Sequence, residues 1–107
     1  MNWNIQYTPD AERELDGIFT YIHDILMEPS VAKKQLARIR DSAISLDYFP
    51  LRHRLCEHEP WRSRGVRVLP VDNYLIFYHP DESTHIVTIL RIIHGARDIA
   101  TQLNRSD

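Results

Sequence analysis

Apolar residues recur at helical spacing in two sets along the first half of the chain. The members of the first set follow at steps of four, three, one, three and four residues: Ala11, Leu15, Ile18, Phe19, Ile22 and Leu26. The members of the second set alternate at four and three: Ala32, Leu36, Ile39, Ala43 and Leu46. Each spacing is typical of one apolar stripe along an amphipathic helix. We therefore expect two helices, each with a single face to bury.

Capping and breaking residues mark the ends of these two helices. Thr8 precedes Pro9, which suits an N-cap followed by the first helical position. Residues 27–30 (Met-Glu-Pro-Ser) interrupt the apolar pattern, and Ser30 can cap the second helix. The sequence therefore predicts an antiparallel helical hairpin that runs from Thr8 to about Tyr48.

The second half of the chain reads as three consecutive antiparallel strands, because runs rich in Val, Ile, Tyr, Phe and Thr alternate with turn formers. The strands are predicted over residues 64–71, 74–79 and 86–94. Asp72 and Asn73 suit a two-residue hairpin turn, since both residue types tolerate positive φ. Residues 80–83 (Pro-Asp-Glu-Ser) indicate a second turn. A short strand is expected at residues 3–7, and a short helix at residues 96–103.

The predicted element order, β-α-α-β-β-β-α, indicates a single α+β domain over residues 1–107. We expect two layers, with the helical hairpin packed on a curved antiparallel four-stranded sheet. The hairpin covers one face of the sheet, and the other face stays free to carry function. Residues 51–63 have no regular period and hold most of the basic residues, so they are predicted to form a loop.

Composition adds an uneven distribution of charge to this picture. The chain is 43% hydrophobic and 26% charged, as in ordinary globular proteins, and its net charge is −2. The first predicted helix is acidic, whereas residues 52–67 are rich in arginine. A basic segment of this kind can contact an anionic target. The arginines that we take as candidate target-binding residues are Arg52, Arg54, Arg62, Arg64, Arg91 and Arg97.

Several features point to a cytoplasmic protein without a metal or a cofactor. The single cysteine, Cys56, cannot form an internal disulfide, which fits a reducing compartment. The amino-terminal residues lack the features of a signal peptide, and the most apolar run, residues 86–93, is too short to span a bilayer. His53 and His58 flank Cys56 too loosely for a zinc site. We therefore expect no metal, no cofactor and no membrane contact.

Several segments occur in a distinctive order. They are the amino-terminal strand, Phe49-Pro50, Arg67-Val68-Leu69-Pro70-Val71, Asn73-Tyr74-Leu75-Ile76-Phe77-Tyr78, and the closing run from Ile89 to Ile99 with His94-Gly95-Ala96-Arg97-Asp98. Together they resemble the RelE/ParE superfamily of bacterial toxins from type II toxin–antitoxin systems, over nearly the whole chain. The resemblance implies a small α+β toxin that stops growth when free. It also implies a co-expressed antitoxin protein that holds the toxin inactive.

The superfamily divides by target, so the resemblance implies two alternative activities. RelE-like members cut messenger RNA on the ribosome, and ParE-like members poison DNA gyrase and lack the nuclease residues. Leu75 stands where RelE-like enzymes often carry an arginine, and no lysine follows Lys34. These departures favour a ParE-like toxin that acts on DNA gyrase or a similar target. Ribosome-dependent cleavage of messenger RNA is the alternative.

A metal-independent ribonuclease needs a base, a cation for the phosphorane charge and an acid for the leaving oxygen. If this chain is such an enzyme, Glu57 or Glu59 supplies the base, Arg67 the cation and His94 the acid. Histidine suits the last role because it titrates near the working pH. The alternative is that both glutamates are solvated loop charges paired with neighbouring arginines.

Two strand arginines have more than one interpretation. Arg67 faces away from Val66 and Val68, either on the open sheet face near a phosphate or paired with an acid at the edge. Arg91 lies in an apolar strand, where an arginine is costly unless it reaches solvent or a partner. A salt bridge to Asp98 and a contact with the target both satisfy that requirement.

Overall fold

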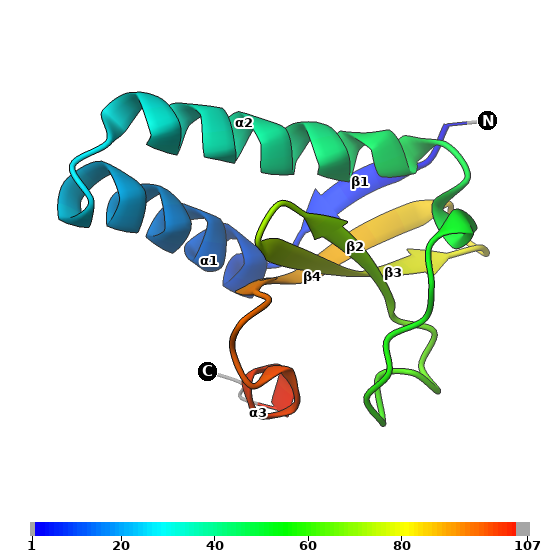
Figure 1. The fold of residues 1–107 in the computed structure, drawn as a ribbon. Coiled ribbons are helices and arrows are strands. Elements are labelled where there is room, and N and C mark those ends of the chain that lie inside the picture. Colours follow the sequence, from blue (N-terminus) through cyan, green and yellow to red (C-terminus); the bar gives the residue numbers. More distant parts are fainter. Residues whose placement is uncertain (1, 105–107) are drawn as a thin grey trace.

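The computed structural model describes residues 2–104 and places a helical layer on one side of a sheet (Figure 1). The elements, in chain order, are β1 (Asn4–Tyr7), α1 (Pro9–Thr20), a π-helical turn (Tyr21–Ile25), α2 (Pro29–Ile44), two 3-10 turns (Ser45–Asp47 and Pro50–Arg52), β2 (Arg67–Val71), β3 (Tyr74–Asp81), β4 (Ile86–His94) and α3 (Ile99–Asn104). This order confirms the predicted α+β class and the helical hairpin.

Thr8 caps α1 as predicted. The Ala11 N–H donates to Thr8 Oγ1 at 3.1 Å, and the Thr8 hydroxyl donates to the Leu90 carbonyl at 2.8 Å. Pro9 opens the helix, where its missing N–H costs no hydrogen bond. The Thr8 side chain thus caps the start of α1 and links this helix to β4.

The start of α2 differs from the prediction. Glu28 is the N-cap residue without a side-chain capping bond, and Pro29 is the first helical residue. Ser30 therefore lies inside the first turn, and the prediction that it caps α2 is wrong. Pro29 sets the helix start instead, because its fixed φ suits the first turn.

The π-helical turn after α1 shifts the apolar stripe. Ala11, Leu15 and Ile22 are buried as predicted, but Leu26 is 50% exposed. The Leu26 N–H donates to the Tyr21 carbonyl five residues earlier, at 3.0 Å. The wider turn moves the following residues off the buried face. The predicted stripe is therefore correct up to Ile22.

The sheet has the strand order β1-β4-β3-β2. β2 and β4 both pair antiparallel with β3, as predicted. β1 instead pairs parallel with β4, from Asn4 beside Ile86 to Tyr7 beside Ile89. The sheet is therefore mixed, and the antiparallel prediction is wrong for β1. No short turn fixes the direction of β1, because both helices and the following loop separate it from β2.

Both predicted turns of the meander exist, although the second begins later than expected. Asp72 has φ 55° in the turn between β2 and β3. Arg38 of α2 donates to both oxygens of its carboxylate, at 2.7 and 2.8 Å, and Gln35 donates to it at 3.0 Å. Pro80 belongs to β3, and the second turn covers residues 82–85. The first turn is thereby fastened to the helical layer.

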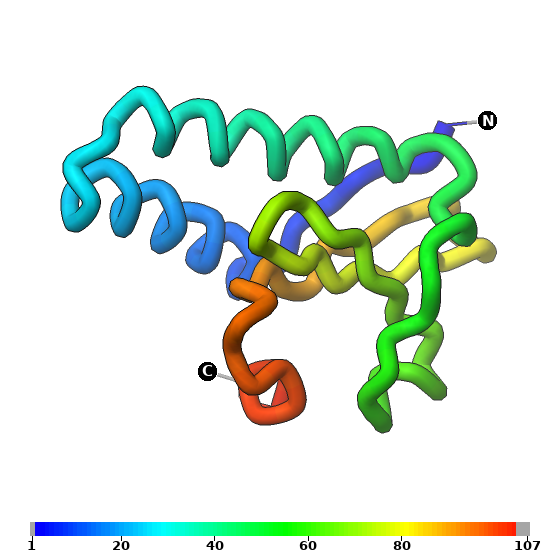
Figure 2. Tube along the Cα trace, in the orientation of Figure 1, coloured from blue at the N-terminus to red at the C-terminus, as the bar shows by residue number. Residues whose placement is uncertain are grey.

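The main core lies between the helical hairpin and the sheet. Its buried members come from both helices, from the 3-10 turn after α2 and from strands β2, β3 and β4: Ala11, Leu15, Ile39, Ala43, Leu46, Val71, Ile76, Tyr78, Val87, Ile89 and Ile92. Figure 2 shows the two helices running side by side in opposite directions over the strands. The predicted two-layer packing is confirmed.

The opposite face of the sheet is also covered. A second apolar cluster on this side joins residues from the loop, β2, β3, β4 and α3: Cys56, Val66, Val68, Phe77, Ile93 and Leu103. The loop of residues 53–66 and α3 both project from this side of the sheet in Figure 1. The prediction of a free face is wrong, because alternate residues of β2, β3 and β4 are apolar on this side too.

Candidate functional site

A groove of about 640 Å³ lies beside α1, where the end of β4 leads toward α3. Its lining comes from α1, the adjoining π-helical turn, β3, β4 and the carboxyl-terminal segment: Glu14, Gly17, Ile18, Tyr21, Tyr74, Ile92, Ile93, His94, Arg97 and Gln102. We call this feature the α1 groove. Its volume is that of a binding site for a small molecule or a few side chains.

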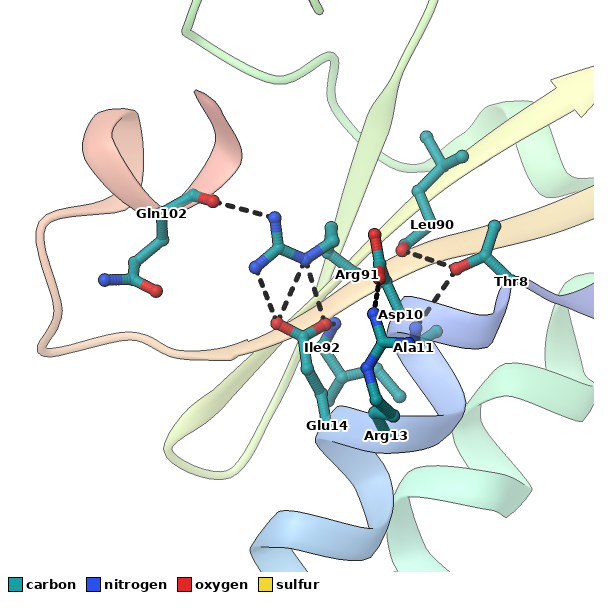
Figure 3. A network of polar contacts seen from close by, with 9 residues as sticks. All are labelled: Thr8, Asp10, Ala11, Arg13, Glu14, Leu90, Arg91, Ile92 and Gln102. Atoms are coloured by element: carbon teal, nitrogen blue, oxygen red, sulfur yellow. Dashed lines mark hydrogen bonds and ion pairs between the residues drawn. The ribbon is translucent and has the colours of Figure 1, made fainter. Parts of the chain in front are cut away.

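Arg91 neutralises the carboxylate of Glu14 in the wall of the α1 groove (Figure 3). The Arg91 Nε and Nη2 donate to the Glu14 oxygens at 2.7 to 3.0 Å, and the Ile92 N–H donates to the same carboxylate at 2.9 Å. The Arg91 Nη1 donates to the Gln102 carbonyl in α3 at 2.7 Å. The two charged side chains are only 15% and 23% exposed. This contact joins α1, β4 and α3.

Arg91 therefore forms its ion pair with Glu14 instead of Asp98, which was one of the two predicted alternatives. The Asp98 carboxylate accepts from the Thr101 N–H at 3.3 Å and from the Thr101 hydroxyl at 2.9 Å. These bonds stabilise the start of α3. Arg91 is a candidate target-binding residue whose guanidinium faces Glu14 and α3 in this structure.

The carboxyl-terminal end of the groove presents hydrogen-bond donors. The Ala96 N–H donates to His94 Nδ1 at 3.1 Å, so the neutral imidazole carries its proton on Nε2. The His94 ring stands edge-on to Tyr74 at 5.3 Å. Burial, with Tyr21 nearby, raises the pKa of the Tyr74 phenol, which keeps this hydroxyl protonated. Within residues 2–104, no hydrogen bond or ion pair occupies the Arg97 guanidinium.

The three candidate ribonuclease residues do not converge. His94 of β4 lies opposite Tyr74 at one edge of β3. Arg67 of β2 lies opposite Tyr78 at the other edge of β3. Tyr74 and Tyr78 are four positions apart in β3, which places the two pairs about 13 Å apart along the strand. The Glu57 side chain is 75% exposed in the loop, and its carboxylate lies 3.7 Å from a guanidinium nitrogen of Arg54. This placement matches the alternative of a solvated loop charge.

Arg67 lies on the helical side of the sheet, because its strand partner Tyr78 belongs to the main core. Its Nη1 donates to the His53 carbonyl at 2.7 Å, and its Nε is buried without a hydrogen-bond partner in the described structure. Neither expected environment, the open face or an acidic partner, is found among the described residues. Arg67 instead links β2 to His53, in the loop that follows the helical layer.

Tyr78 and His53 pack beside Arg67. The Tyr78 hydroxyl donates to the Pro50 carbonyl at 2.6 Å, and burial raises the pKa of Tyr78 to about 12. The His53 ring meets the Tyr78 ring edge-on at 6.3 Å. Burial, and then the charge of Arg52, lower the pKa of His53. This region holds a neutral histidine and a neutral tyrosine between two arginines.

The predicted basic segment is not one uniform patch. Arg52 folds back on the end of the helical layer and donates to the carbonyls of Ser45, Tyr48 and Phe49. Arg62 donates to the Cys56 carbonyl at 3.5 Å. The Arg64 guanidinium lies over the Trp61 ring at 5.3 Å. Arg52 therefore has a structural role, and the remaining loop arginines keep exposed side chains.

Sequence reasoning missed the α1 groove and its residues Glu14 and Tyr21. Their spacing was a usable signal, because Glu14, Ile18 and Tyr21 fall on one helical face at steps of four and three. The arginine in the apolar strand was a second signal, since it requires an acidic partner. The sequence could not show which of the many acids in the first helix fills that role.

Exposed apolar side chains gather at the two ends of the helical layer. One group surrounds the hairpin tip: Tyr21, Ile25, Leu26, Met27 and Val31. The other follows the end of α2: Ile44, Tyr48, Phe49 and Leu51. Each group contains a residue with positive φ, Met27 at 55° and Phe49 at 53°. Exposed apolar patches of this kind are typical of protein interfaces.

Residues 2–104 lack two further features. No group of three His, Cys, Asp or Glu side chains converges there to hold a metal ion. Among the same residues, no helix has the length and apolar character needed to cross a membrane.

Comparisons with known proteins agree with this fold. No curated protein sequence matches the chain significantly. Among solved structures, the chain is similar to a chromosomal ParDE toxin–antitoxin system from P. aeruginosa, with a TM-score of 0.70, 22% identity, and coverage of 86% of this chain and 95% of that chain. It is also similar to the RelBE2 toxin–antitoxin complex from Mycobacterium tuberculosis, with a TM-score of 0.65, 23% identity, and coverage of 88% and 99%.

A more distant likeness joins the chain to the isolated E. coli RelE toxin, with a TM-score of 0.52, 10% identity, and coverage of 94% of each chain. At these identities the structural similarities concern the fold alone. The sequence model of the ParE toxin of type II toxin–antitoxin systems matches residues 5–99, which is most of the chain. The chain therefore belongs to the ParE toxin family of type II toxin–antitoxin systems.

Proposed function

We propose that this toxin inhibits DNA gyrase or a similar target without cutting RNA, and that a cognate antitoxin protein holds it inactive. The observation that carries the first part is the separation of the three candidate nuclease residues. His94 and Arg67 pair with β3 from its two opposite edges, at Tyr74 and at Tyr78 four positions later, and Glu57 projects into solvent beside Arg54. A general acid, a general base and a cation must reach one scissile phosphate, which this arrangement does not favour.

Two further features support a non-nuclease toxin. Leu75 stands where RelE-like enzymes often carry an arginine, and the chain has no lysine after Lys34. The net charge of −2 also disfavours entry into the anionic environment of the ribosome, since each phosphate contact requires a cation.

The antitoxin partner is supported by surface chemistry and by the relatives. Apolar side chains are exposed at both ends of the helical layer, and such surface is usually covered by a partner. The two most similar structures described above are toxin–antitoxin systems. We expect the product of a short neighbouring reading frame to co-purify with the chain and to suppress its toxicity. A chain that stays monodisperse and binds no such product contradicts this part of the proposal.

The target is tested by two assays run side by side on the purified toxin. One is a translating extract with messenger cleavage as its readout, and the other is DNA supercoiling by gyrase. We expect inhibition of supercoiling that survives Arg67→Ala and His94→Gln, with circular dichroism confirming that both variants fold. The ribosome-dependent ribonuclease is the second candidate. Messenger cleavage that disappears in both variants, with supercoiling unaffected, decides for that alternative.

A further inference from the structure

The α1 groove offers several hydrogen-bond donors, and the described residues of its lining include no unpaired carboxylate. Among residues 2–104, Glu14 is the one carboxylate in its lining, and Arg91 together with the Ile92 N–H already satisfies its oxygens. His94 presents its Nε2–H, because Nδ1 accepts from a backbone amide. Tyr74 presents a protonated hydroxyl, and Arg97 an unpaired guanidinium within the described chain. This set is complementary to a carboxylate.

The rest of the lining is apolar. Ile18, Ile92 and Ile93 line the groove between the donors. Tyr21 lines it too, and its ring is also part of the exposed apolar group at the hairpin tip. The groove is therefore continuous with a larger apolar surface along α1. A ligand that covers both must be longer than a small molecule.

We propose that the α1 groove receives an acidic side chain, flanked by apolar side chains, from an extended segment of a polypeptide partner. Arg97 pairs with the carboxylate, His94 and Tyr74 donate to it, and the flanking apolar side chains cover Ile18 and Tyr21. The identity of that partner as the antitoxin rests on the proposed function, whereas the chemistry of the groove does not.

The groove is a better receptor for an acid than the arginine-rich loop. Arg54 already lies near Glu57, Arg52 is bound to backbone carbonyls, and Arg64 stacks on Trp61. Arg97 is exposed like the loop arginines, but it lines the groove together with two further donors, His94 and Tyr74. In the groove an apolar wall borders the donors, so the same carboxylate contributes affinity and orientation.

Two blocked peptides of equal shape test the proposal on the full-length toxin: acetyl-Leu-Phe-Glu-Leu-amide and its counterpart with Gln in place of Glu. Binding is followed by NMR, through the chemical shifts of the Gly17, Arg97 and Gln102 amides. We expect the Glu peptide to bind about tenfold more tightly than the Gln peptide, as for a charge-assisted hydrogen bond. Arg97→Gln should abolish that difference, and the matched control Arg64→Gln should preserve it.

The variant Gly17→Leu tests independently whether the peptides bind in the α1 groove. A Cβ at Gly17 meets no atom within 4 Å, so leucine fits there, favours the helix and fills the groove. This variant should weaken the binding of both peptides by the same factor. Equal binding of the two peptides to the wild type, or a Glu preference that survives Arg97→Gln, overturns the proposal. Binding of 4-phenylbutyrate as tight as that of the Glu peptide also overturns it, in favour of a small-molecule site. None of these measurements involves gyrase or the antitoxin, so they fail or succeed independently of the proposed function.

Discussion

Glu14 of α1 and Arg91 of β4 are 77 positions apart in the sequence and form a partly buried ion pair that also reaches α3 through the Gln102 carbonyl. Removing one charge from such a pair leaves the other without compensation. We expect Glu14→Gln to lower the free energy of unfolding by about 2 kcal/mol, less than for a fully buried pair because water reaches both groups. Urea denaturation measures this loss.

Glu12 provides a matched control on the same helix. Its carboxylate lies 3.8 Å from an Arg40 nitrogen, and both side chains are well exposed. Glu12→Gln should therefore change the free energy of unfolding by less than about 0.5 kcal/mol. Equal losses for the two variants would show that the partly buried contact with Arg91 contributes no more to stability than the exposed contact with Arg40.

The buried hydroxyl of Tyr78 leads to a second prediction. It donates to the Pro50 carbonyl at 2.6 Å, and the Tyr78 side chain is fully buried in the main core. Tyr78→Phe leaves that carbonyl unsatisfied and should cost about 1 to 2 kcal/mol of folding free energy. Tyr48→Phe is the control, since the Tyr48 side chain is largely exposed. The prediction is contradicted if both variants unfold at the same urea concentration.

The elements that the sequence predicted correctly are those set by local chemistry. The apolar steps through Leu15 and Ile22, the Thr8 cap and the positive φ at Asp72 are all decided within a few residues. The direction of β1 was not predictable in this way, because its partner β4 begins about eighty residues later. Leu26 left the predicted stripe because a π-helical turn changes the period without a sequence signal.

The candidate site was predicted less well than the fold. The sequence indicated that Arg91 needs a partner, but it offered Asp98 nearby and gave no reason to choose Glu14. It also singled out His94 and Arg97, which do line the α1 groove. It could not place them beside Tyr21, because that contact depends on how α1 crosses the sheet. Side chains from distant elements make a site only after tertiary packing is known.

The Arg38 and Asp72 ion pair gives a third prediction, which concerns acid. Hydrogen bonds from Arg38 and Gln35 hold the pKa of Asp72 below its usual value of 3.8. A carboxyl group with a lowered folded-state pKa stabilises the fold above its unfolded-state pKa, and this stabilisation is lost as the pH falls through the folded-state pKa. Asp72→Asn should therefore be less stable than the wild type near neutral pH. The difference should vanish in strong acid.

Urea midpoints of the wild type and Asp72→Asn, measured across the acid range, check this expectation. Arg38→Gln removes the donor and should reproduce the same loss at neutral pH. The double variant should lose less than the sum of the two single variants, because both remove one interaction. Additive losses would mean that Arg38 and Asp72 act on stability independently.

His53 gives the last prediction, with a dependence on pH near neutrality. Burial, and then the positive charge of Arg52, lower the pKa of His53 below its usual value of 6.5. The unfolded chain therefore binds a proton at a pH where the folded chain does not, so stability rises with pH over this interval. The contribution of His53 is lost as the pH falls through about 6.5 toward the lower folded-state pKa.

Substitution separates this histidine from the other five. His53→Phe keeps a ring beside Tyr78 and cannot titrate, so its stability should change less than that of the wild type between about pH 5 and about pH 7.5. Arg52→Gln lowers stability at every pH, since it removes hydrogen bonds to the end of the helical layer. It should also weaken the pH dependence, because one of the two causes of the His53 shift is gone. Identical pH profiles for the wild type and His53→Phe would show that another group controls the stability in this range.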